Sequence, residues 1–172
     1  MTSVAKILLV DDSDVDRERI RRQLGSAFAY VEAVTASEGL ALANDGELSC
    51  VLLDYRLPDK DGLSLIPHFV NCGLPVIMLT GQGAEETAVA ALKAGAHDYF
   101  VKGRTDAAGL SRAIYKAMEL SRLRSEVKQQ EAALQRKDDL LFNVLDAMPI
   151  GIHVVDAGGA SFYANKRAVE LL

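Results

Sequence analysis

Short apolar runs alternate with stretches of helical pattern through the first 105 residues of the chain. Most of these runs are apolar at successive positions, as in strands buried on both faces of a parallel sheet, whereas the second run alternates more and suits the periphery. The runs occupy residues 6–10, 30–34, 50–54, 75–79 and 98–101. Five alternations of strand and helix predict a doubly wound α/β fold, a parallel sheet with helices on both faces.

The stretches between the runs predict short helices at 13–25, at 37–44, from about 62 onward, and at 84–94. Pro67 falls where the second turn of the third helix is expected, and an interior proline costs about 3 kcal/mol by removing a backbone hydrogen bond. We therefore expect this helix to be short or kinked. Gly95 is a typical C-terminal stop for the fourth helix, and the glycines of residues 81–83 predict a flexible loop before it.

A much longer helical pattern runs from Asp106 to about Met148. We expect Leu110, Ile114 and Ala117 to pack on the sheet. Beyond them, apolar residues recur at alternating spacings of three and four, which is the seam of a coiled coil. Its members are Leu120, Leu123, Val127, Leu134, Leu141 and Val144, with Met148 at the end and the polar interruptions Gln130 and Lys137. The seam predicts a parallel homodimer; a single amphipathic helix is the alternative.

Residues 148–172 follow a different pattern. Pro149 and Gly151 break the helix, and residues 148–159 open a hairpin whose return strand is 160–165. A further helix is expected from Lys166.

Composition bounds the class of protein. The 172 residues are 49% hydrophobic and 25% charged, which fits one globular domain with an appendage. No apolar run approaches the roughly 20 residues of a membrane span, and the first residues lack the apolar core of a signal peptide. Cys50 and Cys72 are expected to be reduced thiols of a cytoplasmic protein, and no spacing suggests a zinc site.

The net charge of −5 is unevenly distributed along the chain. The first 105 residues hold 10 basic and 15 acidic side chains and so carry the whole excess. No basic stripe suggests a nucleic-acid surface. An acidic domain of this kind suits a bound cation.

Chemically active side chains follow the predicted strands: Asp11 and Asp12, Asp54, Thr80, and Lys102. In open α/β sheets, ligands bind at the edge formed by the carboxyl ends of the strands. Three neighbouring carboxylates repel one another unless a cation lies among them, and hard oxygen ligands favour Mg²⁺ over zinc. With a lysine and a hydroxyl opposite, the set suits formation of an acyl phosphate on a carboxylate.

Four motifs carry a resemblance to a known family. They are the Asp11-Asp12 pair, the Leu57–Gly62 stretch after Asp54, Leu79-Thr80-Gly81, and the Asp98–Lys102 stretch. Residues 4–120 resemble, on these motifs, the receiver domain of two-component response regulators. The resemblance implies a flavodoxin-like five-stranded sheet of order 2-1-3-4-5.

The resemblance also implies a chemical role for the acidic residues. Asp54 would take a phosphoryl group from a phosphohistidine on a histidine kinase or phosphotransfer protein. Asp11, Asp12 and Asp54 would hold Mg²⁺ together with the backbone carbonyl of Arg56.

The remaining site residues have implied roles as well. Lys102 would contact the phosphoryl oxygens, Thr80 would turn toward the phosphate, and Tyr99 would follow it inward as an aromatic switch. One departure stands out, since the family usually has proline after this lysine, often with a cis bond, whereas Gly103 and Arg104 follow here. This puts the family's loop geometry at that point in doubt.

Residues 148–172 are similar to the opening of a PAS domain; a small capping hairpin is the alternative. Because a PAS ligand pocket needs more chain, we expect the sequence to be part of a longer protein. The predicted organisation is a receiver domain at 1–120, a coiled-coil linker at 121–147 and a truncated PAS-like segment at 148–172.

The main interpretation is a phosphoacceptor switch that signals through a dimeric helix to a downstream module, with no enzyme activity beyond its own phosphorylation and dephosphorylation. A pseudo-receiver scaffold without phosphotransfer is the alternative, and the complete set of Asp54, Thr80 and Lys102 argues against it. Phosphatases with an aspartate nucleophile place a second acid two residues later, where this chain has Arg56. No helix-turn-helix or basic face suggests a transcription factor.

Overall fold

The computed structural model of the protein describes residues 4–81, 85–104 and 106–170. They divide between Arg124 and Ser125 into two compact units. The larger part of the predicted loop at 81–83 lies outside the described residues.

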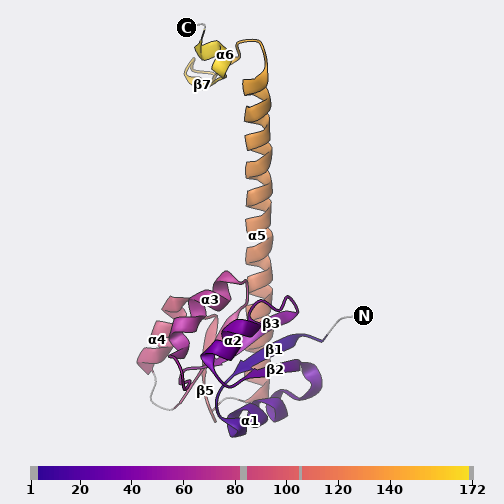
Figure 1. Ribbon diagram of the computed structural model, residues 1–172, viewed down its shortest axis with the longest axis vertical. Coiled ribbons are helices and arrows are strands. Elements are labelled where there is room, and N and C mark those ends of the chain that lie inside the picture. Colours follow the sequence, from indigo (N-terminus) through magenta and orange to yellow (C-terminus); the bar gives the residue numbers. More distant parts are fainter. Residues whose placement is uncertain (1–3, 82–84, 105, 171–172) are drawn as a thin grey trace. The chain divides into compact units, whose positions relative to one another are not determined.

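The first unit is built on a five-stranded sheet of order β2-β1-β3-β4-β5, in which every neighbouring pair is parallel (Figure 1). The strands are β1 Lys6–Val10, β2 Ala29–Ala33, β3 Leu48–Asp54, β4 Val76–Thr80 and β5 Asp98–Val101. The predicted flavodoxin-like fold and its strand order are confirmed. The largest difference is at β3, which begins two residues before the predicted run.

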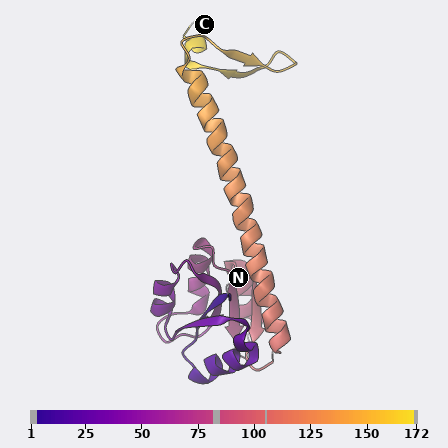
Figure 2. The same cartoon turned by 90° about the vertical axis from the view of Figure 1, so that its right-hand side faces the viewer.

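Helices cover both faces of this sheet (Figures 1 and 2). They are α1 Asp14–Leu24, α2 Ala36–Leu42, α3 Ile66–Asn71, α4 Glu85–Ala94 and the beginning of α5 Ala107–Ala147, with the 3-10 turns η1 Gly25–Ala27 and η2 Gly62–Leu65. Side chains of β1 alternate between two cores: Leu8 and Val10 face the α2–α3 core, and Ile7 and Leu9 face the α1–α5 core. Buried positions on both faces explain the continuous apolar runs.

The third helix is short, as predicted. The chain forms the 3-10 turn η2 before the six-residue α3, and Pro67 lies at the start of α3. Proline is tolerated in the first helical turn because its missing N–H would have no partner there.

The first turns of α5 pack on the sheet through the predicted residues Leu110, Ile114 and Ala117, all of them buried. Further along, Ser121 Oγ donates a hydrogen bond to the carbonyl of Gly73 at 2.9 Å. Leu120 and Leu123, the first two residues of the predicted seam, are 38% and 44% exposed.

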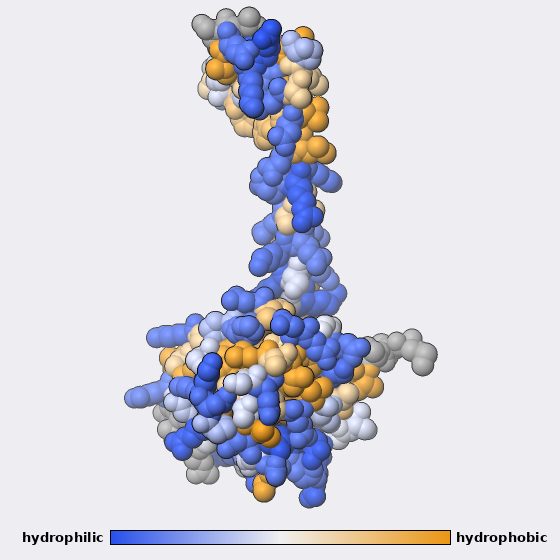
Figure 3. Space-filling model, in the orientation of Figure 1, coloured by the Kyte–Doolittle hydropathy of each residue, from blue (hydrophilic) through white to orange (hydrophobic). Residues whose placement is uncertain are grey.

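The second unit contains residues 125–147 of α5, the antiparallel hairpin of β6 His153–Val155 and β7 Ser161–Ala164, and α6 Lys166–Val169. The predicted hairpin and following helix are confirmed. Figure 3 shows polar side chains along the middle of α5 and apolar ones gathered near its C-terminal end. In the described part of the chain, no helix is long and apolar enough to cross a membrane.

Asn165 organises the second unit although its side chain is polar and fully buried. Its Nδ2 donates to the carbonyls of Leu145, at 2.8 Å, and Ile150, at 2.9 Å. Its Oδ1 accepts from the amides of Ile152, at 2.8 Å, and Ala168, at 2.9 Å. One side chain therefore joins the end of α5, the loop after it, the hairpin and α6.

Candidate functional site

Three carboxylates meet at the carboxyl edge of the sheet. Asp11 and Asp12 directly follow β1, and Asp54 is the last residue of β3. One oxygen from each lies within 4.8 Å of the others. Asp11 and Asp54 are buried and Asp12 is exposed, so the cluster is open to solvent on one side.

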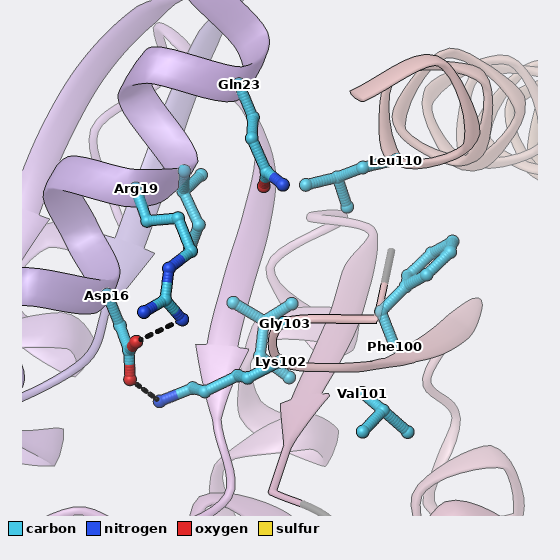
Figure 4. Close-up of a pocket in the computed structure, with 10 residues that line it drawn as sticks. Asp16, Arg19, Gln23, Phe100, Val101, Lys102, Gly103 and Leu110 are labelled. Atoms are coloured by element: carbon cyan, nitrogen blue, oxygen red, sulfur yellow. Dashed lines mark hydrogen bonds and ion pairs between the residues drawn. The ribbon is translucent and has the colours of Figure 1, made fainter. Parts of the chain in front are cut away.

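Lys102 follows β5 and reaches into this cluster. Its Nζ lies 2.7 Å from Asp11 Oδ2 and 3.0 Å from Asp54 Oδ2. It also lies 3.1 Å from Oδ2 of Asp16, a residue of the first turn of α1 (Figure 4). The sequence predicted the first two neighbours and missed the third.

The charges in this site adjust one another's ionisation. Burial raises the pKa of Asp54 above its usual value, while the hydrogen bond and charge of Lys102 act in the opposite direction. Burial alone would lower the pKa of Lys102, but hydrogen bonds and charges from Asp11 and Asp54 outweigh it and raise that pKa. Lys102 therefore remains a cation at neutral pH, available to bind phosphoryl oxygens.

Arg17, which was not among the residues predicted for the site, fixes the turn between β1 and α1. It is buried, its Nη1 donates to the carbonyl of Asp11 at 2.5 Å, and its Nε donates to Glu32 at 2.8 Å. The Ser13 amide donates to Asp11 Oδ1 at 2.9 Å. The signal was present in the spacing, because Arg17 lies three residues before Ile20 on the buried face of α1.

The carboxylate cluster fits a divalent cation. The buried Oδ2 of Asp11 is paired with the ammonium of Lys102 at 2.7 Å, and one oxygen from each of Asp11, Asp12 and Asp54 lies within 4.8 Å of the others. Carboxylates this close repel one another unless cations lie among them, and hard oxygen ligands favour Mg²⁺. The acidic pocket is of the kind in which receiver domains bind Mg²⁺. The backbone of Arg56 pairs with Asp61 in the loop after β3, and its carbonyl as a metal ligand stays a prediction.

The two expected switch residues lie on β4 and β5, the strands that follow β3 in the sheet. Thr80 is fully buried at the end of β4, and its Oγ1 donates to the carbonyl of Phe100 at 3.4 Å. Tyr99 lies on β5 with 38% of its surface exposed. The predicted inward movement of both therefore requires a rearrangement from this conformation.

Asp59 has a structural role that the sequence did not indicate. Its carboxylate accepts hydrogen bonds from the amides of Ala36, at 2.8 Å, and Ser37, at 3.0 Å, and from the Ser37 hydroxyl at 2.8 Å. These bonds, led by that of Ala36, lower the pKa of Asp59 to about 2. The loop after β3 is thereby attached to the N-terminus of α2.

The departure at Gly103 corresponds to a distinct turn. Gly103 has a φ of 80°, and the Arg104 amide donates to the carbonyl of Val101 at 3.1 Å. A positive φ at the third position of a turn favours glycine. All peptide bonds of the described residues are trans, so the loop differs from the proline loop usual in the family.

The first unit is an α/β domain of the flavodoxin-like class. Its acidic residues and Lys102 lie at the carboxyl edge of the sheet, where domains of this class bind their ligands. Residues 7–115 match the family model described as the response regulator receiver domain, and the chain belongs to that family.

Curated relatives are longer proteins. The chain is 35% identical to the regulatory protein AtoC of Escherichia coli over 141 residues, which cover 78% of this chain and 30% of AtoC. It is 36% identical to the transcriptional regulatory protein SrrA of Staphylococcus aureus over 99 residues, 56% of this chain and 41% of SrrA. The chain thus spans less than half of either relative.

Solved structures agree with the family. The receiver domain of NtrX from Brucella abortus is 33% identical, with a TM-score of 0.60; the match covers 66% of this chain and 98% of that one. A receiver domain protein from Clostridium thermocellum is 30% identical, with a TM-score of 0.61 and coverage of 69% and 98%.

Proposed function

We propose that Asp54 is the phosphoacceptor of a two-component phosphorelay and that its donor is a histidine kinase or phosphotransfer protein. The observation that carries the proposal is the placement of Asp54 at the end of β3, in one cluster with Asp11 and Asp12 and 3.0 Å from Lys102. A carboxylate in this setting has both a metal site and a cation for the incoming phosphoryl group.

The transfer is a displacement at phosphorus. An oxygen of Asp54 bonds to phosphorus while the bond from phosphorus to the donor histidine nitrogen breaks, and that nitrogen keeps the electron pair. Asp11, Asp12 and Asp54, with the carbonyl of Arg56, would hold Mg²⁺. When bound, Mg²⁺ neutralises charge on the phosphoryl oxygens. Later attack by water on phosphorus releases phosphate and restores the carboxylate.

The residues that bind and read the phosphoryl group come from the neighbouring strands. The ammonium of Lys102 pairs with a phosphoryl oxygen. Thr80 then exchanges its bond to the Phe100 carbonyl for one to the phosphoryl group, and Tyr99 moves into the space that Thr80 leaves. Phosphorylation of Asp54 thereby changes the surface of β5 around Tyr99.

The chemical test uses the full chain with acetyl phosphate and Mg²⁺, followed by intact mass. Asp54→Asn is expected to abolish labelling, and Asp59→Asn is expected to keep it, because the Asp59 carboxylate caps α2 instead of facing the acidic cluster. Undiminished labelling of Asp54→Asn would show that another residue is the acceptor. A wild-type protein that takes no label under these conditions would favour the pseudo-receiver scaffold.

The output proposal concerns the seam of α5. We propose that two copies pair in parallel along it, which buries large apolar side chains that are 38–62% exposed in one chain. They are Leu120, Leu123, Val127, Leu134, Leu141 and Val144. In this arrangement residues 1–120 receive the signal, residues 121–147 transmit it, and the PAS-like segment 148–172 begins the next module.

Phosphorylation would act on this pair through Tyr99 and the beginning of α5, changing the rotation or register of the two helices. We place the protein in the cytoplasm, where the described thiols Cys50 and Cys72 remain free, as they are in the structure.

A further inference from the structure

We propose that Asp16 is a positioning residue for Lys102, holding its ammonium when Mg²⁺ occupies the carboxylates of Asp11 and Asp54. The inference rests on the proposed metal site and adds to it a residue of α1 outside the acidic cluster.

The geometry divides the partners of Lys102 into two groups. Asp11 and Asp54, at 2.7 and 3.0 Å from Nζ, belong to the cluster that can hold the ion. Asp16, at 3.1 Å, lies outside that cluster on the first turn of α1 (Figure 4). Lys102 thus contacts two carboxylates that the ion needs and a third that it does not.

A fixed orientation suits Asp16 to this role. Its Oδ1 pairs with Nη1 of Arg19 at 3.1 Å, which leaves Oδ2 facing Lys102. Both the Asp16 and the Lys102 side chains are largely covered, with 22% and 17% exposed. An ion pair that is partly shielded from water is stronger than one on the open surface.

Binding of the ion creates a conflict that Asp16 resolves. The Lys102 ammonium and Mg²⁺ are both cations and compete for the same oxygens of Asp11 and Asp54. A covered ammonium that loses its partners pays the cost of an unpaired charge. Because Asp16 already contacts Nζ, Lys102 can leave the metal ligands and still keep a carboxylate partner.

The structure also has space on the side of Asp16. A cavity of about 30 Å³ lies beside Lys102, bordered by Asp16, Arg19 and Leu110 (Figure 4). The flexible four-carbon stem of lysine can use such space. The ammonium then stays close enough to meet a phosphoryl oxygen when one arrives at Asp54.

The test is Mg²⁺ binding to the full chain, measured by isothermal titration calorimetry without any phosphodonor. Asp16→Asn is expected to lower the Mg²⁺ affinity about fivefold, at the lower end of ordinary coupling between sites. The Asp16→Ala variant should behave alike, and Asp16→Glu should restore most of the affinity. Asp14→Asn is the matched control: it removes the same charge from the same helical turn, but its carboxylate is 88% exposed and pairs with Arg17.

A double-mutant cycle separates positioning from direct attraction to the ion. In a Lys102→Met background, Asp16→Asn is expected to leave the Mg²⁺ affinity unchanged, because the competing ammonium is gone. An equal loss of affinity in both backgrounds would mean that Asp16 attracts the ion directly, and would overturn the proposal. No loss in the wild-type background would overturn it as well.

The result is independent of phosphotransfer. If acetyl phosphate does not label Asp54 but the cycle shows coupling, the phosphoacceptor function fails and the role of Asp16 stands. If Asp54 is labelled and the cycle shows no coupling, the phosphoacceptor function stands and the role of Asp16 fails.

Discussion

Gly62 lies against the main chain of Asp54, so close that a Cβ on Gly62 would be 2.1 Å from the Asp54 carbonyl oxygen. The Gly62 amide donates to the carbonyl of Tyr55 at 2.9 Å, which folds the loop back onto the end of β3. The carbonyl is backbone and cannot move aside as a flexible side chain could. Glycine at this position therefore allows the loop to fold back against the end of β3, beside Asp54.

Gly62→Ala is expected to destabilise the first unit by about 1–3 kcal/mol, the usual cost of overpacking, and to slow labelling of Asp54 by displacing its backbone. Urea denaturation and labelling with acetyl phosphate measure the two effects. Gly46→Ala is the control, since a Cβ there would have nothing within 4 Å. Equal behaviour of the two variants would contradict this account of the loop.

The hydrogen bonds of Asp59 predict a pH-dependent stability. Its folded-state pKa, about 2, is below the ordinary 3.8, so its contribution is complete above that ordinary value and is lost as pH falls toward 2. Asp59→Asn should therefore be less stable than wild type at pH 6, and the difference should shrink as the pH approaches 2. Thermal unfolding across this range measures it, and a difference that stayed constant would argue against the carboxylate as the cap of α2.

Asn165 predicts a local loss of order in the second unit. Asn165→Ala removes four hydrogen bonds, one of them buried and three part-buried, at a cost of about 2–4 kcal/mol to this unit. Hydrogen exchange should become faster at residues 150–165 and stay unchanged in the sheet of the first unit. Asn143→Ala, at an exposed position of the same unit, should leave both unchanged; protection that survives in Asn165→Ala would refute the role.

The seam predicts the oligomeric state. Light scattering on the 172-residue chain should report a dimer, and Leu134→Asp with Leu141→Asp should dissociate it, because the charges would enter the apolar interface. Gln129→Asp with Asn143→Asp adds the same charge to the helix away from the seam and should preserve the dimer. A monomer at tens of micromolar, or a dimer indifferent to both pairs of changes, would exclude this interface.

The sequence predicted the sheet well because β1, β3 and β4 are buried on both faces and therefore form continuous apolar runs. It also predicted that Asp11, Asp54 and Lys102 would meet, since each lies at the end of a strand and parallel strands end at one edge. The order of the strands, which the resemblance to receiver domains implied, was the only further knowledge that the prediction needed. It required no knowledge of how any helix packs.

The order and ends of the strands could not predict the contacts that helices and loops make. The distance from Asp16 to Lys102 depends on where the first turn of α1 lies relative to the end of β5, and the bonds from Asp59 to α2 connect segments 22 and 23 residues apart. Neither contact produces a periodic pattern of residues that could be recognised in the sequence. Arg17 is different, because its helical spacing from Ile20 marked a buried position that a charged residue was not expected to fill.

Gly103 has a consequence for redesign of the chain by consensus. Proline is usual after this lysine in the family, so an averaged family sequence would recommend Gly103→Pro as a stabilising change. The pyrrolidine ring holds φ near about −65°, whereas the turn that follows Lys102 has a φ of 80° at this residue. The residue most common among its relatives is therefore one that this backbone cannot accept, and a consensus design must retain the glycine or rebuild the whole turn.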